Sequence, residues 1–197
     1  MGTYHERHAK PGYWGDITRH FDTSVELIDV GCGVGWLADH FVNYSGLESH
    51  SLAVQGAQDR GRNVLLGDVS QPWPFDDGKF TGAVLKDVLE HVVDPAPVLG
   101  ELRRVLRHGS VAWASAPDNQ RWVWEDYTHR RPFPLKALRH LFDDNGFRVL
   151  EAGYETVIPG SGIVSDWTSS HRRPVLFQVA GRVRWLRRNT WVLAEAV

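Results

Sequence analysis

Short apolar runs alternate with amphipathic stretches along most of the chain, and this alternation predicts strands and helices in turn. The runs that have the length and composition of strands are Val25–Val30, Tyr44–Leu47, Asn63–Asp68, Phe80–Lys86, Ser110–Ser115, Phe147–Tyr154 and Thr190–Val197. Strands that alternate with helices are typical of an α/β fold with a mostly parallel sheet. We therefore expect a single α/β sheet built from these runs.

The stretch "DPAPVLGELRRVLRHG" has the strongest helical pattern. Asp94 can cap its first turn, Pro95 suits that turn, and Gly109 lies just past its end. Its apolar residues recur at helical spacing and predict one buried face. Other helices are expected after Gly35 and at residues 51–61 and 134–146.

Length, charge and cysteine content narrow the class of protein. The 197 residues suit one domain, and a net charge of −2 gives no general affinity for polyanions. The single cysteine, Cys32, excludes an internal disulfide framework and favours a reducing compartment. The N-terminus lacks the apolar core of a signal peptide, and no run reaches roughly eighteen apolar residues, so we expect a cytoplasmic protein with no membrane span. The composition leaves the oligomeric state open.

The loop after the first strand, Gly31-Cys32-Gly33-Val34-Gly35-Trp36, nearly matches the dinucleotide fingerprint G-x-G-x-x-G. Trp36 stands where the third glycine lets helix and strand pack closely, and Asp29 lies close to where a pyrophosphate would bind. Two like charges roughly 4 Å apart repel by about 1 kcal/mol in water, and by more in a partly dry site. The loop therefore favours a ligand that carries a positive charge and no phosphate.

S-adenosylmethionine (SAM) has these properties, since it carries an ammonium, a carboxylate and a sulfonium group. The glycines let the backbone approach the ligand, and the N-terminus of the following helix can face its carboxylate. Asp29 is expected on the ammonium side, Glu48 at the ribose hydroxyls and Asp68 at the adenine amine. An acid in the position of Glu48 also suits NAD, so Glu48 does not discriminate between the two cofactors.

Four segments in order carry a family resemblance: "IDVGCGVGWLADHF", "GLE", "GDVSQPWPFDDGKF" and "LKDVLEHVVDPAPVLGELRRVLRHGSVAWASAPDN". Together they resemble the class I SAM-dependent methyltransferases, most closely the branch with quinone-biosynthesis and other small-molecule enzymes, over residues 26–150. The resemblance implies a Rossmann-like sheet of seven strands in the order 3-2-1-4-5-7-6, the seventh antiparallel, with helices on both faces. The chain departs from the family at "LRHGS", where a Pro-Gly-Gly turn is usual.

The resemblance also implies the cofactor contacts by position. It places the first SAM-binding motif in the glycine loop and an acid that binds the ribose after the second strand. The turn that contacts the adenine follows the third strand, and the methionine part of SAM lies beside the end of the fourth. The residues concerned are Asp29, Gly31, Cys32, Gly33, Gly35, Glu48, Asp68, Val69, Lys86 and Asp87. Methyl transfer needs no thiol, so we expect Cys32 to be a small residue in a crowded turn and not a nucleophile.

Family members often fold the segment before the first strand over the cofactor. We therefore expect one domain over the whole chain, with an N-terminal lid at 1–24, a SAM-binding half at 25–115 and an acceptor-side half at 116–197. Tyr4 is expected to contact SAM from the lid, with Tyr13 as the alternative.

Two histidines are the candidate catalytic residues, because an alcohol acceptor needs a general base and histidine is the usual base near neutral pH. His91 follows the fourth strand at the carboxyl edge of the sheet, where ligands bind in this architecture. His129, in "WEDYTHRRPF", follows the fifth strand among charged and aromatic residues. A structural role is the alternative for both. His5 and His8 have helical spacing but no evident third ligand, so no metal site is expected.

The leading hypothesis is SAM-dependent methyl transfer to a hydroxyl or carboxylate of a small metabolite, natural product or sugar. The arginine-rich segment 171–189 leaves a nucleic-acid methyltransferase open. That alternative is disfavoured, because Leu85-Lys86-Asp87-Val88 replaces the Asn/Asp-Pro-Pro-Tyr-type motif of base amino-methyltransferases. A protein that binds SAM without catalysis is the third hypothesis.

Overall fold

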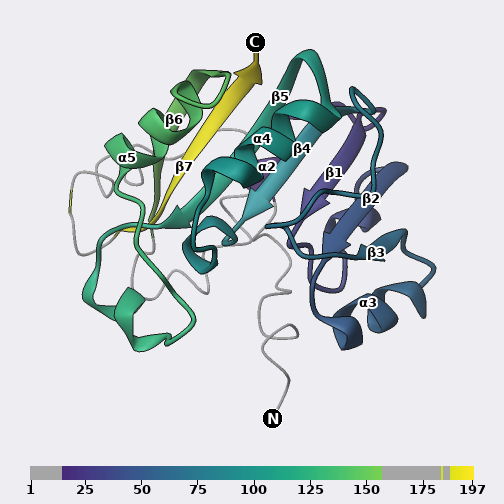
Figure 1. Cartoon of the computed structure of the whole chain (residues 1–197), viewed down its shortest axis with the longest axis horizontal. Coiled ribbons are helices and arrows are strands. Elements are labelled where there is room, and N and C mark those ends of the chain that lie inside the picture. Colours follow the sequence, from purple (N-terminus) through teal and green to yellow (C-terminus); the bar gives the residue numbers. More distant parts are fainter. Residues whose placement is uncertain (1–14, 157–182, 184–186) are drawn as a thin grey trace.

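The computed structural model describes residues 15–156, 183 and 187–197. These residues form one sheet from β1 (Glu26–Val30), β2 (Asn43–Glu48), β3 (Val64–Leu66), β4 (Phe80–Lys86), β5 (Leu106–Pro117), β6 (Phe147–Thr156) and β7 (Arg187–Ala196). The strand order is β3-β2-β1-β4-β5-β7-β6, and β7 runs antiparallel to both of its neighbours (Figure 1). The predicted α/β class and strand order are confirmed. Tyr4, Tyr13, His5, His8 and most of segment 171–189 lie outside the described residues.

Helices cover both faces of this sheet. One face packs against α4 (Ala96–Val105) and α5 (Leu135–Asp143), whose buried residues share one apolar core with the strands. The other face packs against α2 (Gly15–Thr18), the 3-10 helix η1 (Trp36–Asp39) and α3 (Ser51–Gln58) in a second core. Figure 1 shows α4 crossing in front of β4 and β5. Among the described residues, no helix is long and apolar enough to cross a membrane.

The connection between β1 and β2 differs from the expected α-helix. Twelve residues separate Val30 from Asn43, and the glycine loop takes the first five of them. Of the remaining residues, four form the 3-10 helix η1 and the other three lead into β2. The expectation of a longer helix after Gly35 is therefore wrong, and a single 3-10 turn aligns few peptide dipoles.

Helix α4 begins as predicted but ends earlier. The Asp94 carboxylate accepts the Ala96 N–H over 3.0 Å, which supports the expected cap. The helix stops at Val105, and Leu106 already belongs to β5. Gly109 has a φ of 80° within β5, where the register with β4 shifts. Gly109 therefore lies at an irregularity of β5, where glycine is well suited. It does not mark the end of the helix, as we expected.

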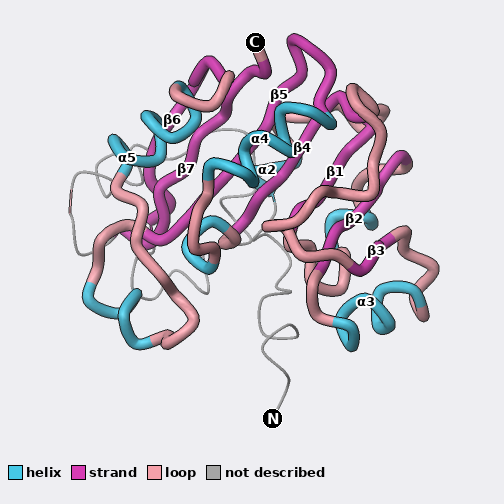
Figure 2. The backbone as a smooth tube through the Cα atoms, viewed as in Figure 1, coloured by secondary structure: helices cyan, strands magenta, loops and turns pink. Residues whose placement is uncertain are grey.

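The carboxyl ends of β1, β2, β4 and β5 meet at one edge of the sheet (Figure 2). β1 lies between β2 and β4, and its last residue, Val30, pairs with one residue of each. The glycine loop, Glu48 and Lys86 therefore lie at the same level. Two short 3-10 turns, η2 (Leu89–His91) and η3 (Arg121–Glu125), follow β4 and β5 at this edge.

Gly46 in β2 stands where the sheet leaves no room for a side chain. A Cβ there would lie 2.5 Å from Cys32 Sγ and 2.9 Å from both Tyr44 Oη and Val64 Cγ2. We expect Gly46→Ala to lower the free energy of unfolding by about 1–3 kcal/mol in urea titrations followed by circular dichroism.

Gly100→Ala is the matched control. Gly100 lies on α4, and an added Cβ would meet nothing within 4 Å. Because alanine favours a helix more than glycine does, this change should raise the free energy of unfolding by about 0.5–1 kcal/mol. Equal effects of the two substitutions would contradict the tight packing around Gly46.

Candidate functional site

The backbone conformation of the glycine loop after β1, and a backbone hydrogen bond to β2, hold the loop in place. Gly31, Gly33 and Gly35 have φ angles of 69°, 56° and 73°, which favour glycine. The Gly31 N–H donates to the Leu47 carbonyl over 2.8 Å. A Cβ on Gly31 would lie 2.5 Å from Cγ2 of Val88, so the segment after β4 packs directly on the loop. A side chain at position 31 would clash with this segment, so glycine is required there.

Glu48, at the end of β2, holds the glycine loop. Its Oε2 accepts the Gly33 N–H and its Oε1 accepts the His50 N–H, each over 2.8 Å. The side chain is buried. Oε1 also accepts the Ser49 hydroxyl over 3.4 Å, whereas Oε2 keeps a second lone pair that can accept a hydrogen bond from a diol. Its role at the ribose remains a prediction that this position supports.

Asp29 lies beneath the loop and is only 3% exposed. The Tyr44 hydroxyl donates to Asp29 Oδ2 over 2.9 Å. Burial raises the pKa of Asp29 to about 7; the Tyr44 hydrogen bond opposes this rise and the charge of Glu48 adds to it. Burial, together with the Asp29 charge, also raises the pKa of the Cys32 thiol well above its usual range. A protonated thiol is a poor nucleophile, in line with the role expected for Cys32.

Trp36, the residue that departs from the dinucleotide fingerprint, packs against Arg62. The guanidinium lies 4.8 Å from the Trp36 ring centroid, an arrangement that favours a cation–π interaction. Arg62 also donates to the Val34 carbonyl over 2.8 Å and forms an ion pair with Asp39 at 2.9 Å. One side chain therefore links the loop and η1 to the turn that precedes β3.

Lys86 and Asp87 lie at the end of β4. Lys86 is buried, and its Nζ lies 3.2 Å from Glu155 Oε1 and 3.8 Å from Asp87 Oδ2. Asp87 has a φ of 55°, which is rare for a residue with a side chain, and its Oδ1 accepts a hydrogen bond from the Asn189 amide. Strained backbone of this kind often occurs at binding sites. The contact of both residues with the methionine part of SAM remains a prediction.

Asp68 and Val69 form a turn after β3. Asp68 is exposed, and its Oδ1 accepts the Ser70 N–H over 2.8 Å. Val69 packs against the apolar core. The carboxylate keeps unused lone pairs, so the predicted contact with the adenine amine is compatible with the turn but stays a prediction.

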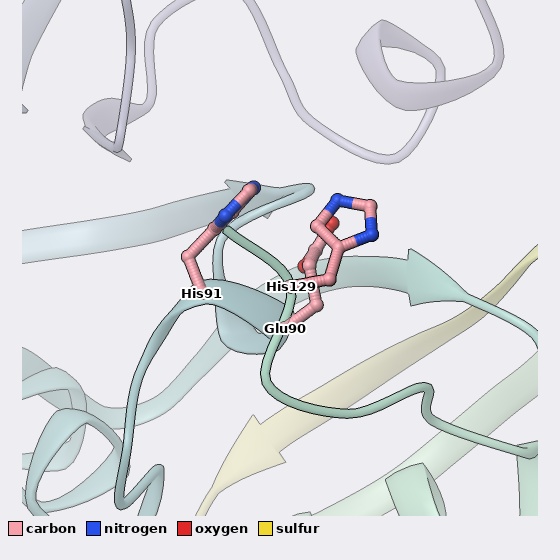
Figure 3. Close-up of side chains that lie close together, drawn as sticks. All are labelled: Glu90, His91 and His129. Carbon is pink, nitrogen blue, oxygen red and sulfur yellow. The ribbon is translucent and has the colours of Figure 1, made fainter. Parts of the chain in front are cut away.

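The two candidate catalytic histidines meet at the same edge (Figure 3). The His91 and His129 rings have centroids 4.8 Å apart and an interplanar angle of 63°. Burial lowers the pKa of His91, and the neighbouring His129 lowers it further. Glu90 lies beside them with no exposed surface; burial and the Asp87 charge raise the pKa of Glu90 well above its usual range.

Hydrogen bonds orient the two rings and identify the nitrogen of each that carries a proton. His129 Nδ1 lies 2.7 Å from the Val123 carbonyl, which can only accept, so Nδ1 carries the proton. The Thr128 hydroxyl donates its one proton to Asp126 over 2.6 Å and can therefore only accept from His91 Nδ1, 3.0 Å away. The remaining ring nitrogen of each histidine is Nε2, and that of His129 lies 3.8 Å from Asp126 Oδ2.

The carboxyl edge fits SAM better than a dinucleotide. Glycine is required by packing at Gly31, against Val88, and at Gly46, against Cys32. Two buried carboxylates, Asp29 and Glu48, lie under the loop and influence each other electrostatically. Carboxylates in this place disfavour a pyrophosphate but suit an ammonium group and a ribose diol.

A sheet in this order, with a glycine loop after β1 and acids near the ends of β1 and β2, is typical of the class I SAM-dependent methyltransferases. A family model described as "Methyltransferase domain" matches residues 6–152. The chain belongs to this family. The narrower quinone-biosynthesis branch stays a prediction.

Curated relatives agree with this assignment. The O-methyltransferase resE of Aspergillus sclerotiorum is 30% identical over 147 residues, which are 64% of this chain and 55% of its own length. An uncharacterized 37.1 kDa protein in transposon TN4556 of Streptomyces fradiae is 32% identical over 190 residues, 83% of this chain and 50% of its own length. The chain thus spans about half the length of the curated relatives it matches.

Solved structures share the fold. A SAM-dependent methyltransferase from Archaeoglobus fulgidus has a TM-score of 0.71 at 15% identity, over 98% of this chain and 97% of its own. The [4+2]-cyclase SpnF has a TM-score of 0.70 at 18% identity, over 94% of this chain and 80% of its own. At these identities the likeness shows the fold alone.

Several site residues were missed by the sequence analysis: Tyr44, Arg62, Glu90, Thr128 and Asn189. Alternation along β2 could have indicated Tyr44, because it lies two residues before Gly46, which pairs with Asp29. No local pattern indicates Arg62 or Asn189, since their partners lie far away in the sequence. Thr128 bonds locally to Asp126, but its contact with His91 is long-range.

The raised pKa of Asp29 makes stability depend on pH. The native state holds this proton up to a pH of about 7, whereas an unfolded aspartate releases it near about 3.9. The contribution of protonated Asp29 to the free energy of unfolding is therefore fully present below about pH 4 and is lost as the pH rises through 7. We expect Asp29→Asn to gain stability relative to the wild type over this range, by as much as about 4 kcal/mol.

Urea unfolding at a series of pH values between about 4 and 8 measures this difference. Asp76→Asn is the control, because Asp76 is exposed and should change the free energy of unfolding by less than about 0.5 kcal/mol at every pH. A constant difference between Asp29→Asn and the wild type across the series would show that Asp29 is already ionised in the native protein.

Proposed function

We propose that this protein transfers the methyl group of SAM to a hydroxyl or carboxylate of a small molecule. The observation that carries the proposal is the buried Glu48 carboxylate that holds the glycine loop through the Gly33 N–H, at the same sheet edge as the His91–His129 pair. Membership of the methyltransferase family and the similarity to an O-methyltransferase support it. One neighbour in fold is titled a [4+2]-cyclase, so the fold by itself does not define the reaction.

Separate residues of the chain are assigned to the cofactor and to the acceptor. SAM supplies an electrophilic methyl group on its sulfonium. Asp29 and Glu48 are assigned to hold the ammonium and the ribose, and the glycine loop sets how closely the cofactor approaches. Because methyl transfer is an in-line displacement, positioning of the acceptor behind the methyl group supplies much of the rate.

The acceptor side is assigned to the His91–His129 pair. An imidazole nitrogen of this pair suits removal of a hydroxyl proton, which an alcohol must lose when it attacks a methyl group. Gly31 packs on Val88, one residue before η2, so the loop and the histidine pair belong to one region. Nearby Trp124 and Tyr127 are 58% and 95% exposed, which favours an acceptor with an aromatic or apolar part.

A nucleic-acid methyltransferase is less well supported. The described residues show no motif of base amino-methyltransferases after β4, and the arginine-rich segment lies mostly outside them. RNA or DNA binding that weakens steeply with added salt would favour this alternative, because phosphate contacts release counterions.

Calorimetric titration with SAM tests the cofactor site. We expect Glu48→Ala to weaken SAM binding roughly 10- to 100-fold, because hydrogen bonds from the ribose to a carboxylate are lost. Glu151→Ala is the control, since Glu151 is exposed on β6 and should leave the affinity unchanged. Equal affinity of both variants and the wild type would refute the assignment of Glu48.

Transfer itself is measured with labelled SAM. Purified protein is incubated with a metabolite extract of its source and labelled SAM, and labelled products are identified by mass spectrometry. A labelled small molecule whose formation requires the protein supports the proposal. Label found only in RNA or DNA would overturn the small-molecule acceptor.

A further inference from the structure

Arg188, near the start of β7, lies at the same edge of the sheet as the candidate site. Because β7 runs antiparallel to β5, its first residues lie beside the carboxyl end of β5. The Arg188 carbonyl accepts the Asp118 N–H over 3.0 Å, and the amide of the next residue, Asn189, donates to Asp87 at the end of β4. These two bonds hold the backbone at Arg188 beside the exits of β4 and β5.

The Arg188 side chain lies over an aromatic ring. Its guanidinium carbon is 5.3 Å from the centroid of the Trp122 ring, within the range of a cation–π interaction. Trp122 belongs to η3 and precedes Val123, whose carbonyl lies 2.7 Å from His129 Nδ1. Figure 1 shows that the chain between β5 and α5, which includes η3, extends past the carboxyl edge of the sheet. One short turn therefore contacts both the guanidinium and a candidate catalytic histidine.

The charge of Arg188 is not neutralised by the part of the chain that the structure describes. Within that part, no acid forms an ion pair with Arg188. Asp87 and Glu155, at the ends of β4 and β6, instead lie 3.8 Å and 3.2 Å from Lys86 Nζ. Arg188 is exposed, and its guanidinium carries N–H donors in a planar fork that matches a carboxylate. The donors are therefore available to an anionic ligand.

We propose that Arg188 binds a carboxylate of the methyl acceptor, and that the acceptor is an aromatic hydroxy acid. This inference rests on the proposed function and deepens it, because it names a substrate class for the same site. A carboxylate can accept two parallel N–H bonds from a guanidinium, which adds geometric specificity to affinity. Trp124 and Tyr127, exposed on the same segment as Trp122, suit the aromatic part of such a molecule.

The carboxylate at Arg188 is not the group that receives the methyl. Its lone pairs are engaged by the guanidinium, which makes it a weaker nucleophile than a free carboxylate. The hydroxyl of the same molecule attacks instead and loses its proton to an imidazole nitrogen of the His91–His129 pair. Its oxygen forms the new O–C bond while the S–C bond of SAM breaks, and sulfur keeps the electron pair as S-adenosylhomocysteine.

Carboxylate binding is measured apart from methyl transfer. The probes are benzoate and benzyl alcohol, which share a ring and differ in charge, and each is titrated into the full chain by ligand-observed NMR. We expect Arg188→Ala to weaken benzoate binding roughly tenfold or more and to leave benzyl alcohol unaffected. Arg188→Lys keeps the charge but not the planar fork, so it should recover only part of the affinity for benzoate.

Arg139→Ala is the matched control, because Arg139 is exposed on α5 and its removal changes the net charge equally. Circular dichroism checks that each variant is folded, which is expected since both arginines are exposed. No benzoate binding to the wild type overturns the inference. Benzoate binding that the two alanine variants weaken equally overturns it as well, because the effect would then come from net charge alone.

Labelled SAM separates the two proposals. A labelled small molecule without a carboxylate overturns the role of Arg188 and leaves the proposed function intact. Benzoate binding that requires Arg188, in a chain that methylates no small molecule, supports the carboxylate site and refutes the proposed function.

The kinetics of an acidic acceptor give a second readout. Arg188→Ala should then raise KM roughly tenfold or more with little change in kcat, because the carboxylate is bound equally in the ground state and the transition state. A fall in kcat at unchanged KM would contradict the assigned role.

Discussion

The parallel pairing of β1 between β2 and β4 is the constraint on which the candidate site depends. Because Val30 pairs with Leu47 and with Leu85, three chain segments leave the sheet at the same level. The glycine loop, Glu48 and the β4 exit therefore become neighbours without any direct attraction between their side chains. A shift of β2 by one residue would turn Tyr44 and Glu48 to the opposite face and remove both from the loop.

The site concentrates buried charge, and the surrounding structure accommodates it in different ways. Asp29 is bound by the Tyr44 hydroxyl and Glu48 by two backbone N–H groups, whereas Lys86 lies between two carboxylates. Burial of such groups opposes folding, and proteins generally retain it only where binding or chemistry requires it. The apolar cores on the two faces of the sheet offset this cost.

Much of the fold could be predicted from the sequence, because apolar runs and turn residues are local signals. β4 was expected at the residues where it occurs, and β7 was expected within a few residues of its observed bounds. The helix after Gly35 and the role of Gly109 were mispredicted, since a helical pattern cannot show how much chain the glycine loop uses or where a strand bulges. For the site, the carboxylates and histidines could be named, but the partners that orient them, such as Thr128 and Val123, come from tertiary contacts.

The short connection between β1 and β2 has a dynamic consequence. A full α-helix would secure this segment by several turns of backbone hydrogen bonds, whereas η1 has a single turn, anchored by the buried Leu37 and by Arg62. Local opening therefore breaks few interactions, and we expect it to need much less free energy than global unfolding. In hydrogen exchange, the amides of η1 should exchange well before those of the neighbouring strands, which would give the cofactor a route of entry that leaves the sheet intact.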